Sequence, residues 1–209
     1  TIGCEKSCGS QPQRSDNPEK LRKAENDALE FLKTAVRIAP VYYSRGNHEW
    51  GIDDAYRNAV KATGAVLLEN EWVKFSNVFI GGQSSASCDA YSHRRCGKHI
   101  LPDTDWLKNS PGGGYKILLC HHPEYYNLVA PYADLIISGH AHGGQWRVFG
   151  RGVFAPGQGL FPKYSRGMYE NKMIVSAGLT NTTWIPRINN PTEPVIVEIY
   201  ATAVDPLKN

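Results

Sequence analysis

The chain has 209 residues, of which 41% are hydrophobic and 21% are charged, a balance that is typical of a soluble globular protein with one core. The formal net charge is +3, and no cluster of Lys and Arg with interleaved aromatic residues occurs, so we expect no nucleic-acid partner. No apolar run approaches the ~18 residues of a membrane span, so the sequence predicts no transmembrane anchor.

The N-terminal part predicts a polar lead-in and then an amphipathic helix. Residues 1–16 are polar and aperiodic, and we interpret them as an irregular lead-in to a single domain over residues 17–209. The tripeptide 17–19 (Asn-Pro-Glu) supplies an N-cap, a proline at the first helical position and an acidic first turn. Apolar residues then recur at helical spacing over 21–36, which predicts a helix with one face on the core.

The rest of the chain alternates between strand and helix patterns. A second helix is predicted over 53–63 and closed by Gly64, a short one over 103–108, and a helical stretch before residue 134. Short apolar runs predict strands at 41–43, 66–68, 72–75, 78–80, 116–120, 134–138, 146–149, 172–176 and 195–200. We expect the three strands between residues 66 and 80 to pair antiparallel. This mixture predicts an α/β sandwich in one domain.

Five cysteines, an odd number, form no disulfide framework in a chain of this length. Cys88 and Cys96 bracket a loop that also holds His93 and His99. A metal clip, a disulfide loop and an exposed insertion with incidental thiols are the alternatives for this loop. Cys120 ends an apolar run, which predicts a buried thiol.

Histidines gather where three of the predicted strands end. Five of the seven histidines lie at such junctions, together with Asn47: His48, His121, His122, His140 and His142. Because catalytic groups collect beyond the carboxyl ends of strands in α/β sheets, we expect these loops to converge on one site. Taken alone, 46–49 could be a capped turn and 121–123 a strand end with one hydrogen-bonded histidine. Together with the two imidazoles in the glycine-rich bend 139–144, they favour a shared transition-metal site.

Three motifs resemble the last three motifs of the calcineurin-like metallophosphoesterases: Gly-Asn-His-Glu at 46–49, His121 before a proline-led loop, and Gly-His-Ala-His at 139–142. Longer stretches resemble the bacterial branch of small phosphodiesterases, which includes enzymes that act on lipid-linked phosphates: GHAHGGQ (139–145), QGLFPKYSRGMY (158–169) and VSAGLTNTTWIPRINNP (175–191).

The resemblance implies two mixed β-sheets packed as a sandwich with helices outside, and a metal-dependent hydrolase of phosphomono- or phosphodiesters. It implies two divalent ions (Mn, Fe or Zn) bridged by a hydroxide. Asn47, His121 and His140 would bind one ion, and His142 would bind the other. His48 would be the acid for the leaving oxygen.

Substrate contacts are expected from the later loops. Trp146, Tyr164 and Arg166 would hold the rest of the substrate, with Arg166 paired to phosphate. We expect a protein that is cytoplasmic or peripheral to a membrane, and a lipid-linked phosphate ester would suit the second location.

The two opening motifs of the family, Asp-x-His and Gly-Asp-x-x-Asp, do not occur in the 209 residues, so we expect an N-terminally shortened fold. Without those carboxylates His142 has few fellow ligands, and the chain is expected to bind one ion better than two. The chain is then a fragment, a natural relative that lost activity, or one with substitute ligands, for which the candidates are Cys4, Cys8, Glu5 and Asp16. The alternative function is a non-catalytic or weakly active metal-binding or interaction domain on the same scaffold.

Overall fold

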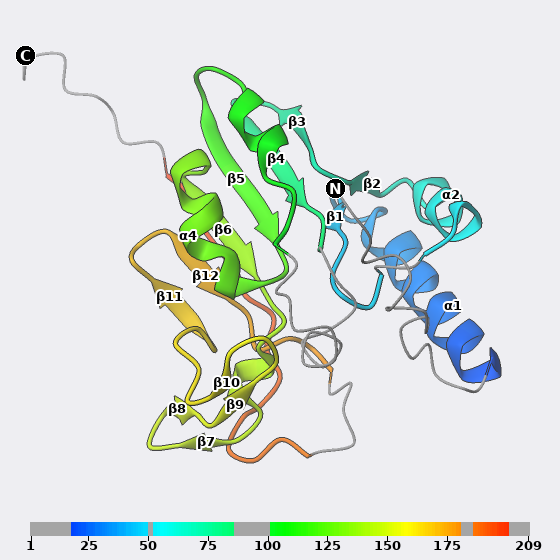
Figure 1. Cartoon of the computed structure of the whole chain (residues 1–209). Helices are drawn as coiled ribbons and strands as arrows, with labels where there is room; N and C mark the ends of the chain where they lie inside the picture. The colour runs from blue at the N-terminus through cyan, green and yellow to red at the C-terminus, as the bar shows by residue number, and fades with distance from the viewer. Residues whose placement is uncertain (1–17, 50–51, 86–100, 181–185, 201–209) are drawn as a thin grey trace, which may run out of the picture.

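A six-stranded mixed sheet forms the centre of the computed structural model, which describes residues 18–49, 52–85, 101–180 and 186–200 (Figure 1). The strand order is β11-β12-β6-β5-β4-β3. The bounds are Glu71–Phe75 for β3, Val78–Gln83 for β4, Tyr115–Cys120 for β5, Leu135–Ser138 for β6, Gly167–Tyr169 for β11 and Met173–Val175 for β12. The four inner strands run parallel, and the edge strands β3 and β11 run antiparallel to their neighbours. The predicted mixed α/β class is confirmed.

A second, two-stranded sheet contacts the large one. Its strands β1 (Tyr42–Ser44) and β2 (Val66–Leu68) pair in parallel and lie against β4 and β5. The approach is close, because a Cβ added at Gly82 of β4 would lie 2.4 Å from Cβ of Leu68. The two sheets therefore pack face to face, as the resemblance implied.

Two helices cover the outer side of this second sheet (Figure 1). They are α1 (Pro18–Ala35) and α2 (Asp54–Ala62). The Asp53 carboxylate accepts a hydrogen bond from the Tyr56 amide at 2.9 Å and caps α2, as Ser, Thr, Asn and Asp commonly do. Both helices thus begin and end close to where the capping and spacing signals predict.

The predicted antiparallel pairing of 66–68 is wrong. The helix α2 connects β1 to β2, and a helical crossover returns the chain in the same direction, so the two strands pair in parallel. Only β3 and β4 form the expected hairpin.

The predicted strand at 195–200 does not form. The apolar side chains there are 37% to 87% exposed, and within the described residues no backbone hydrogen bond joins this segment to a strand. Because a strand exists only when its backbone groups are paired, the apolar pattern alone does not make one.

Smaller elements complete the chain. The hairpins are β7 (Arg147–Val148) with β8 (Arg151–Gly152) and β9 (Phe154–Ala155) with β10 (Gly159–Leu160). Short helical turns lie at Asp105–Asn109, Pro123–Tyr125, Tyr126–Val129 (α4), Ala130–Tyr132 and His142–Gly144. In the described part of the chain, no helix combines the length and the apolar character needed to cross a bilayer.

The main core lies on the large sheet. Leu118, Ile136 and Met173 stand side by side in neighbouring parallel strands and are fully buried, and α4 packs on the same cluster. Cys120 belongs to this core as a free thiol that is 1% exposed, and burial raises its pKa to about 12, so the predicted buried thiol is confirmed.

Several predicted features lie outside the described residues. They are the lead-in 1–16 with Cys4, Glu5, Cys8 and Asp16, and the loop with Cys88, His93, Cys96 and His99.

Candidate functional site

The candidate site lies at the carboxyl edge of the parallel strands. The segments after β5, β6 and β12 leave the sheet at this edge and are tied together by their backbones. The amide of Gly139 donates to the carbonyl of His121 at 3.1 Å, and the amide of Ser176 donates to the carbonyl of Ser138 at 2.9 Å. Parallel pairing therefore brings together histidines that lie about twenty residues apart in the sequence.

The turn after β1 reaches the same place. Asn47 is buried, and its side-chain Oδ1 lies 2.9 Å from Nε2 of His121. Gly46 lies against this imidazole, because an added Cβ would stand 2.9 Å from Cδ2 of His121. Its amide donates to Oε2 of Glu49 at 2.9 Å, which closes the turn. The Gly-Asn-His-Glu motif thus places one amide oxygen beside one imidazole.

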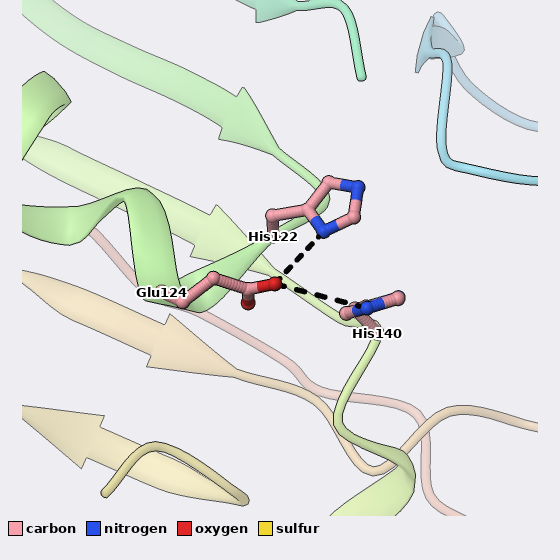
Figure 2. Close-up of side chains that lie close together, drawn as sticks. All are labelled: His122, Glu124 and His140. Carbon is pink, nitrogen blue, oxygen red and sulfur yellow. Dashed lines mark hydrogen bonds and ion pairs between the residues drawn. The ribbon is translucent and has the colours of Figure 1, made fainter. Parts of the chain in front are cut away.

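A second cluster joins His122, Glu124 and His140 (Figure 2). Oε1 of Glu124 lies 3.1 Å from Nδ1 of His122 and 3.8 Å from Nε2 of His140. All three ligand atoms lie within 4.8 Å of one another. Nε2 of His140 and Oε2 of Glu124 are buried without a hydrogen-bond partner, although buried polar atoms normally have one. The cluster therefore offers donor atoms that a cation could bind.

Neighbouring groups hold this cluster in place. Oγ of Ser85, just after β4, lies 2.6 Å from Nε2 of His122, which fixes the plane of that ring. Gly157 lies against Glu124, since a Cβ there would stand 2.0 Å from Oε1. Glu124 itself sits in the helical turn that begins at Pro123. The carboxylate can reach both imidazoles only because residue 157 lacks a side chain.

The two clusters share one group of packed imidazoles. The ring centroid of His140 lies 5.0 Å from that of His121 and 4.2 Å from that of His122, and the rings of His121 and His122 are 5.2 Å apart. Three histidines from two strand ends thus form one continuous patch of imidazole.

The glycine-rich bend is strained at its histidines. His140 and His142 have φ angles of 61° and 47°, a left-handed conformation that costs about 1–3 kcal/mol for a residue other than glycine. Nδ2 of Asn190 donates to the carbonyl of His142 at 2.6 Å and holds the bend from the C-terminal side. Such strain often accompanies a functional site.

Burial keeps the imidazoles of His121, His140 and His142 neutral. It lowers the pKa of His121 to about 3, with smaller effects from His122, His48 and His142. Burial, followed by the neighbouring histidines, also places the pKa of His140 well below its usual value. For His142 burial lowers the pKa first and Arg187 second. Neutral imidazoles have a free lone pair at pH 7, which is the form that binds metal.

His48 is an exposed residue of the turn that carries Asn47. Its charge is close enough to lower the pKa of His121, His140 and His142. The position suits an acid that faces solvent and substrate, and this role stays a prediction.

The three predicted substrate residues have other partners. The indole of Trp146 donates to the carbonyl of Pro186 at 3.0 Å, and the residue is 39% exposed. Tyr164 is buried, with its ring packed edge-on against Tyr169. Arg166 forms an ion pair with Glu193. No hydrogen bond or ion pair among the described residues joins these three side chains to the histidines, so their substrate contacts stay predictions.

Sequence reasoning missed Glu124, Ser85 and the role of His122. The stretch from residue 123 onward indicated only the start of a helix, and Ser85 lay at the edge of a presumed loop. A carboxylate two residues after His122, with a proline between them, is the one sequence signal that points to this contact.

A family model and two named relatives point to one family. A family model described as "Calcineurin-like phosphoesterase" matches residues 12–144. The chain is 30% identical over 161 residues to an uncharacterized metallophosphoesterase of Aquifex aeolicus (strain VF5), which covers 74% of this chain and 58% of that protein.

Two proteins of Bacillus subtilis (strain 168) are also similar. The uncharacterized protein YpbG is 28% identical over 161 residues, which covers 75% of this chain and 57% of that protein. The uncharacterized metallophosphoesterase YkoQ is 28% identical over 124 residues, which covers 57% and 42%. The matched stretches therefore span about half the length of these relatives. No solved structure matches the chain.

Proposed function

This chain belongs to the calcineurin-like phosphoesterase family, and we propose from this premise that it hydrolyses phosphate esters with divalent metal ions held by its histidine cluster. One observation carries the proposal: loops from three strand ends bring Asn47, His121 and His140 into one buried group. Buried imidazoles beside an amide oxygen contribute little to packing, whereas they are common metal ligands.

The donor atoms fit a metal ion. Oδ1 of Asn47 and Nε2 of His121 are 2.9 Å apart, a separation that suits two ligands each about 2.1 Å from one ion. Nε2 of His140 is buried and lacks a hydrogen-bond partner, as an imidazole nitrogen would that awaits a cation. Imidazole and amide donors suit Mn, Fe and Zn. We assign Asn47, His121 and His140 to one ion and His142 to a second.

The protein residues have separate tasks in this proposal. A bound divalent ion supplies Lewis-acid polarisation of the phosphoryl oxygens and a hydroxide nucleophile at neutral pH. His48, an exposed residue of the turn that carries Asn47, would donate a proton to the leaving oxygen as the ester bond breaks. His121, His140 and His142 would hold the ions, because burial keeps these imidazoles neutral and leaves each a lone pair for a metal.

We propose more specifically that the substrate is a phosphodiester, because the later loops resemble those of bacterial phosphodiesterases. The test uses bis(p-nitrophenyl) phosphate with Mn²⁺, Zn²⁺ or Fe²⁺, and compares the unmodified chain with His140→Ala and with the surface variant Lys108→Ala, which loses an exposed ion pair on a distant turn. We expect metal-dependent turnover that EDTA abolishes, that His140→Ala lowers by at least about 100-fold, and that Lys108→Ala leaves unchanged. Equal turnover in His140→Ala would refute the assignment.

A second function has one specific observation in its favour. The 209 residues contain neither Asp-x-His nor Gly-Asp-x-x-Asp, so the family's carboxylate ligands are missing. A chain that binds Zn²⁺ or Mn²⁺ in calorimetry but turns over no phosphate ester with any of the three metals would be a metal-binding domain on the same scaffold.

A further inference from the structure

Arg187 has hydrogen-bond donors that the fold does not use. Its Nη2 donates to the carbonyls of Ala177 at 2.7 Å and Thr180 at 2.6 Å. A guanidinium carries five N–H donors, so those of Nε and Nη1 remain. Both atoms are buried, and neither has a hydrogen-bond partner in the part of the chain that the structure describes. Because a buried N–H without a partner is costly, their position favours an acceptor that the described residues do not supply.

The backbone around Arg187 runs along the histidine bend. The amide of Ile188 donates to the carbonyl of Gln145 at 3.3 Å, and the carbonyl of Ile188 accepts from the amide of Arg147 at 3.0 Å. Nδ2 of Asn190 donates to the carbonyl of His142 at 2.6 Å. Ile188 and Asn190, which follow Arg187, are thus tied to the segment that carries His142.

The guanidinium is anchored to the loop beside that bend. Ala177 and Thr180 follow β12, which is the parallel neighbour of β6, and the bend follows β6. Arg187 therefore lies between two loops at the carboxyl edge of the sheet. Its charge also contributes to the low pKa of His142, which is consistent with a short distance between the two side chains.

The charge of Arg187 is not balanced by a carboxylate of its own. Glu193 lies in the same region, but it forms an ion pair with Arg166, and its Oε1 accepts from the amide of Ala177 at 3.3 Å. Within the described residues Arg187 forms no ion pair. A cation next to neutral imidazoles, with unused donors, favours an anion.

We propose that Arg187, rather than the ion-paired Arg166, binds a phosphoryl oxygen of the substrate on the His142 side of the site. Phosphate oxygens are strong acceptors, and arginine remains charged at any working pH, so the contact suits every phosphate ester. The inference rests on the proposed function for its place in a reaction, but the anion site itself does not depend on turnover.

The test measures binding of inorganic phosphate by calorimetry, with Mn²⁺ present, to the full chain and three variants. Arg187→Ala removes the guanidinium, Arg187→Lys keeps the charge, and Arg151→Ala removes an equal charge from an exposed position on β8. We expect Arg187→Ala to weaken phosphate binding by about 10- to 100-fold and Arg187→Lys by less, while Arg151→Ala stays within about twofold. Far-UV circular dichroism checks that each variant is folded.

The outcomes separate this inference from the proposed function. Phosphate binding that depends on Arg187 in a chain without turnover supports the anion site and contradicts only the hydrolase. Turnover with an unchanged KM in both Arg187 variants contradicts the role of Arg187 in substrate binding and leaves the proposed hydrolase intact. No phosphate binding by the unmodified chain, or an equal loss in Arg151→Ala, overturns the inference.

Discussion

Gly46 and Gly139 lie near the same imidazole and make a matched pair of substitutions. A Cβ at Gly46 would stand 2.9 Å from Cδ2 and 3.0 Å from Nε2 of His121, whereas a Cβ at Gly139 would stand 3.6 Å from Nδ1 of the same ring. The first distance is too short for a real contact, and the second is ordinary van der Waals contact. Neither glycine has a positive φ, so alanine strains the backbone at neither position.

The expected consequence follows from the ring that must move. Gly46→Ala would displace His121 by several tenths of an ångström and break the 2.9 Å separation between its Nε2 and Oδ1 of Asn47. We expect metal affinity to fall by about 10- to 100-fold, as it does when a ligand loses its orientation. Overpacking should also lower the free energy of unfolding by about 1–3 kcal/mol. Gly139→Ala should change metal affinity by less than about threefold.

The assay is Zn²⁺ titration by calorimetry, paired with urea unfolding of the metal-free chain. The comparison is valid only if circular dichroism shows that both variants are folded. Equal metal affinity in Gly46→Ala and the unmodified chain would show that His121 and Asn47 are not ligands of one ion. Equal losses in both variants would show that the effect is unrelated to the contact with His121.

Two further predictions concern charge. Glu124→Gln keeps the size of the side chain but removes the negative charge beside His122 and His140, so Zn²⁺ affinity should fall by about tenfold. The control is Glu30→Gln on the exposed face of α1, which should leave Zn²⁺ affinity unchanged. Equal Zn²⁺ affinity in both variants would contradict the role of the carboxylate. Because the folded-state pKa of His121 is about 3, against about 6.5 in the unfolded chain, its neutral form contributes stability above pH 6.5 that is lost as the pH falls toward 3. Urea unfolding of the metal-free chain should show a loss of about 1.4 kcal/mol per pH unit below 6 from this group, and His121→Gln should reduce the slope; a free energy of unfolding that is flat between pH 7 and 5 would contradict the burial argument.

The elements that could be predicted from the sequence depend on local signals. The helix after Asp53 begins with a side-chain cap and ends before Gly64, and both signals lie next to the helix in the sequence. Strand positions follow from apolar runs, and the histidines at the ends of β5 and β6 follow from parallel strands that end at one edge. Strand pairing depends on which other strand of the chain lies alongside, and local signals do not specify that strand. The pairing of β2 and the unpaired segment 195–200 were therefore mispredicted.

The contacts that sequence reasoning missed join residues from different loops. Ser85 follows β4, Glu124 follows β5 and Gly157 lies between two hairpin strands, yet all three meet at His122 or at one carboxylate. No periodicity encodes such a meeting. Arg187 is a similar case, because no local pattern in the sequence indicates that its Nε and Nη1 are buried without hydrogen-bond partners among the described residues.

The central claim is that Asn47, His121 and His140 hold one metal ion. The most direct measurement is an anomalous difference map from crystals grown with Zn²⁺, recorded on both sides of the zinc absorption edge. We predict a peak about 2.0–2.2 Å from Nε2 of His121, Oδ1 of Asn47 and a nitrogen of His140. A peak bound by none of these three residues, or no peak near them at saturating Zn²⁺, would contradict it.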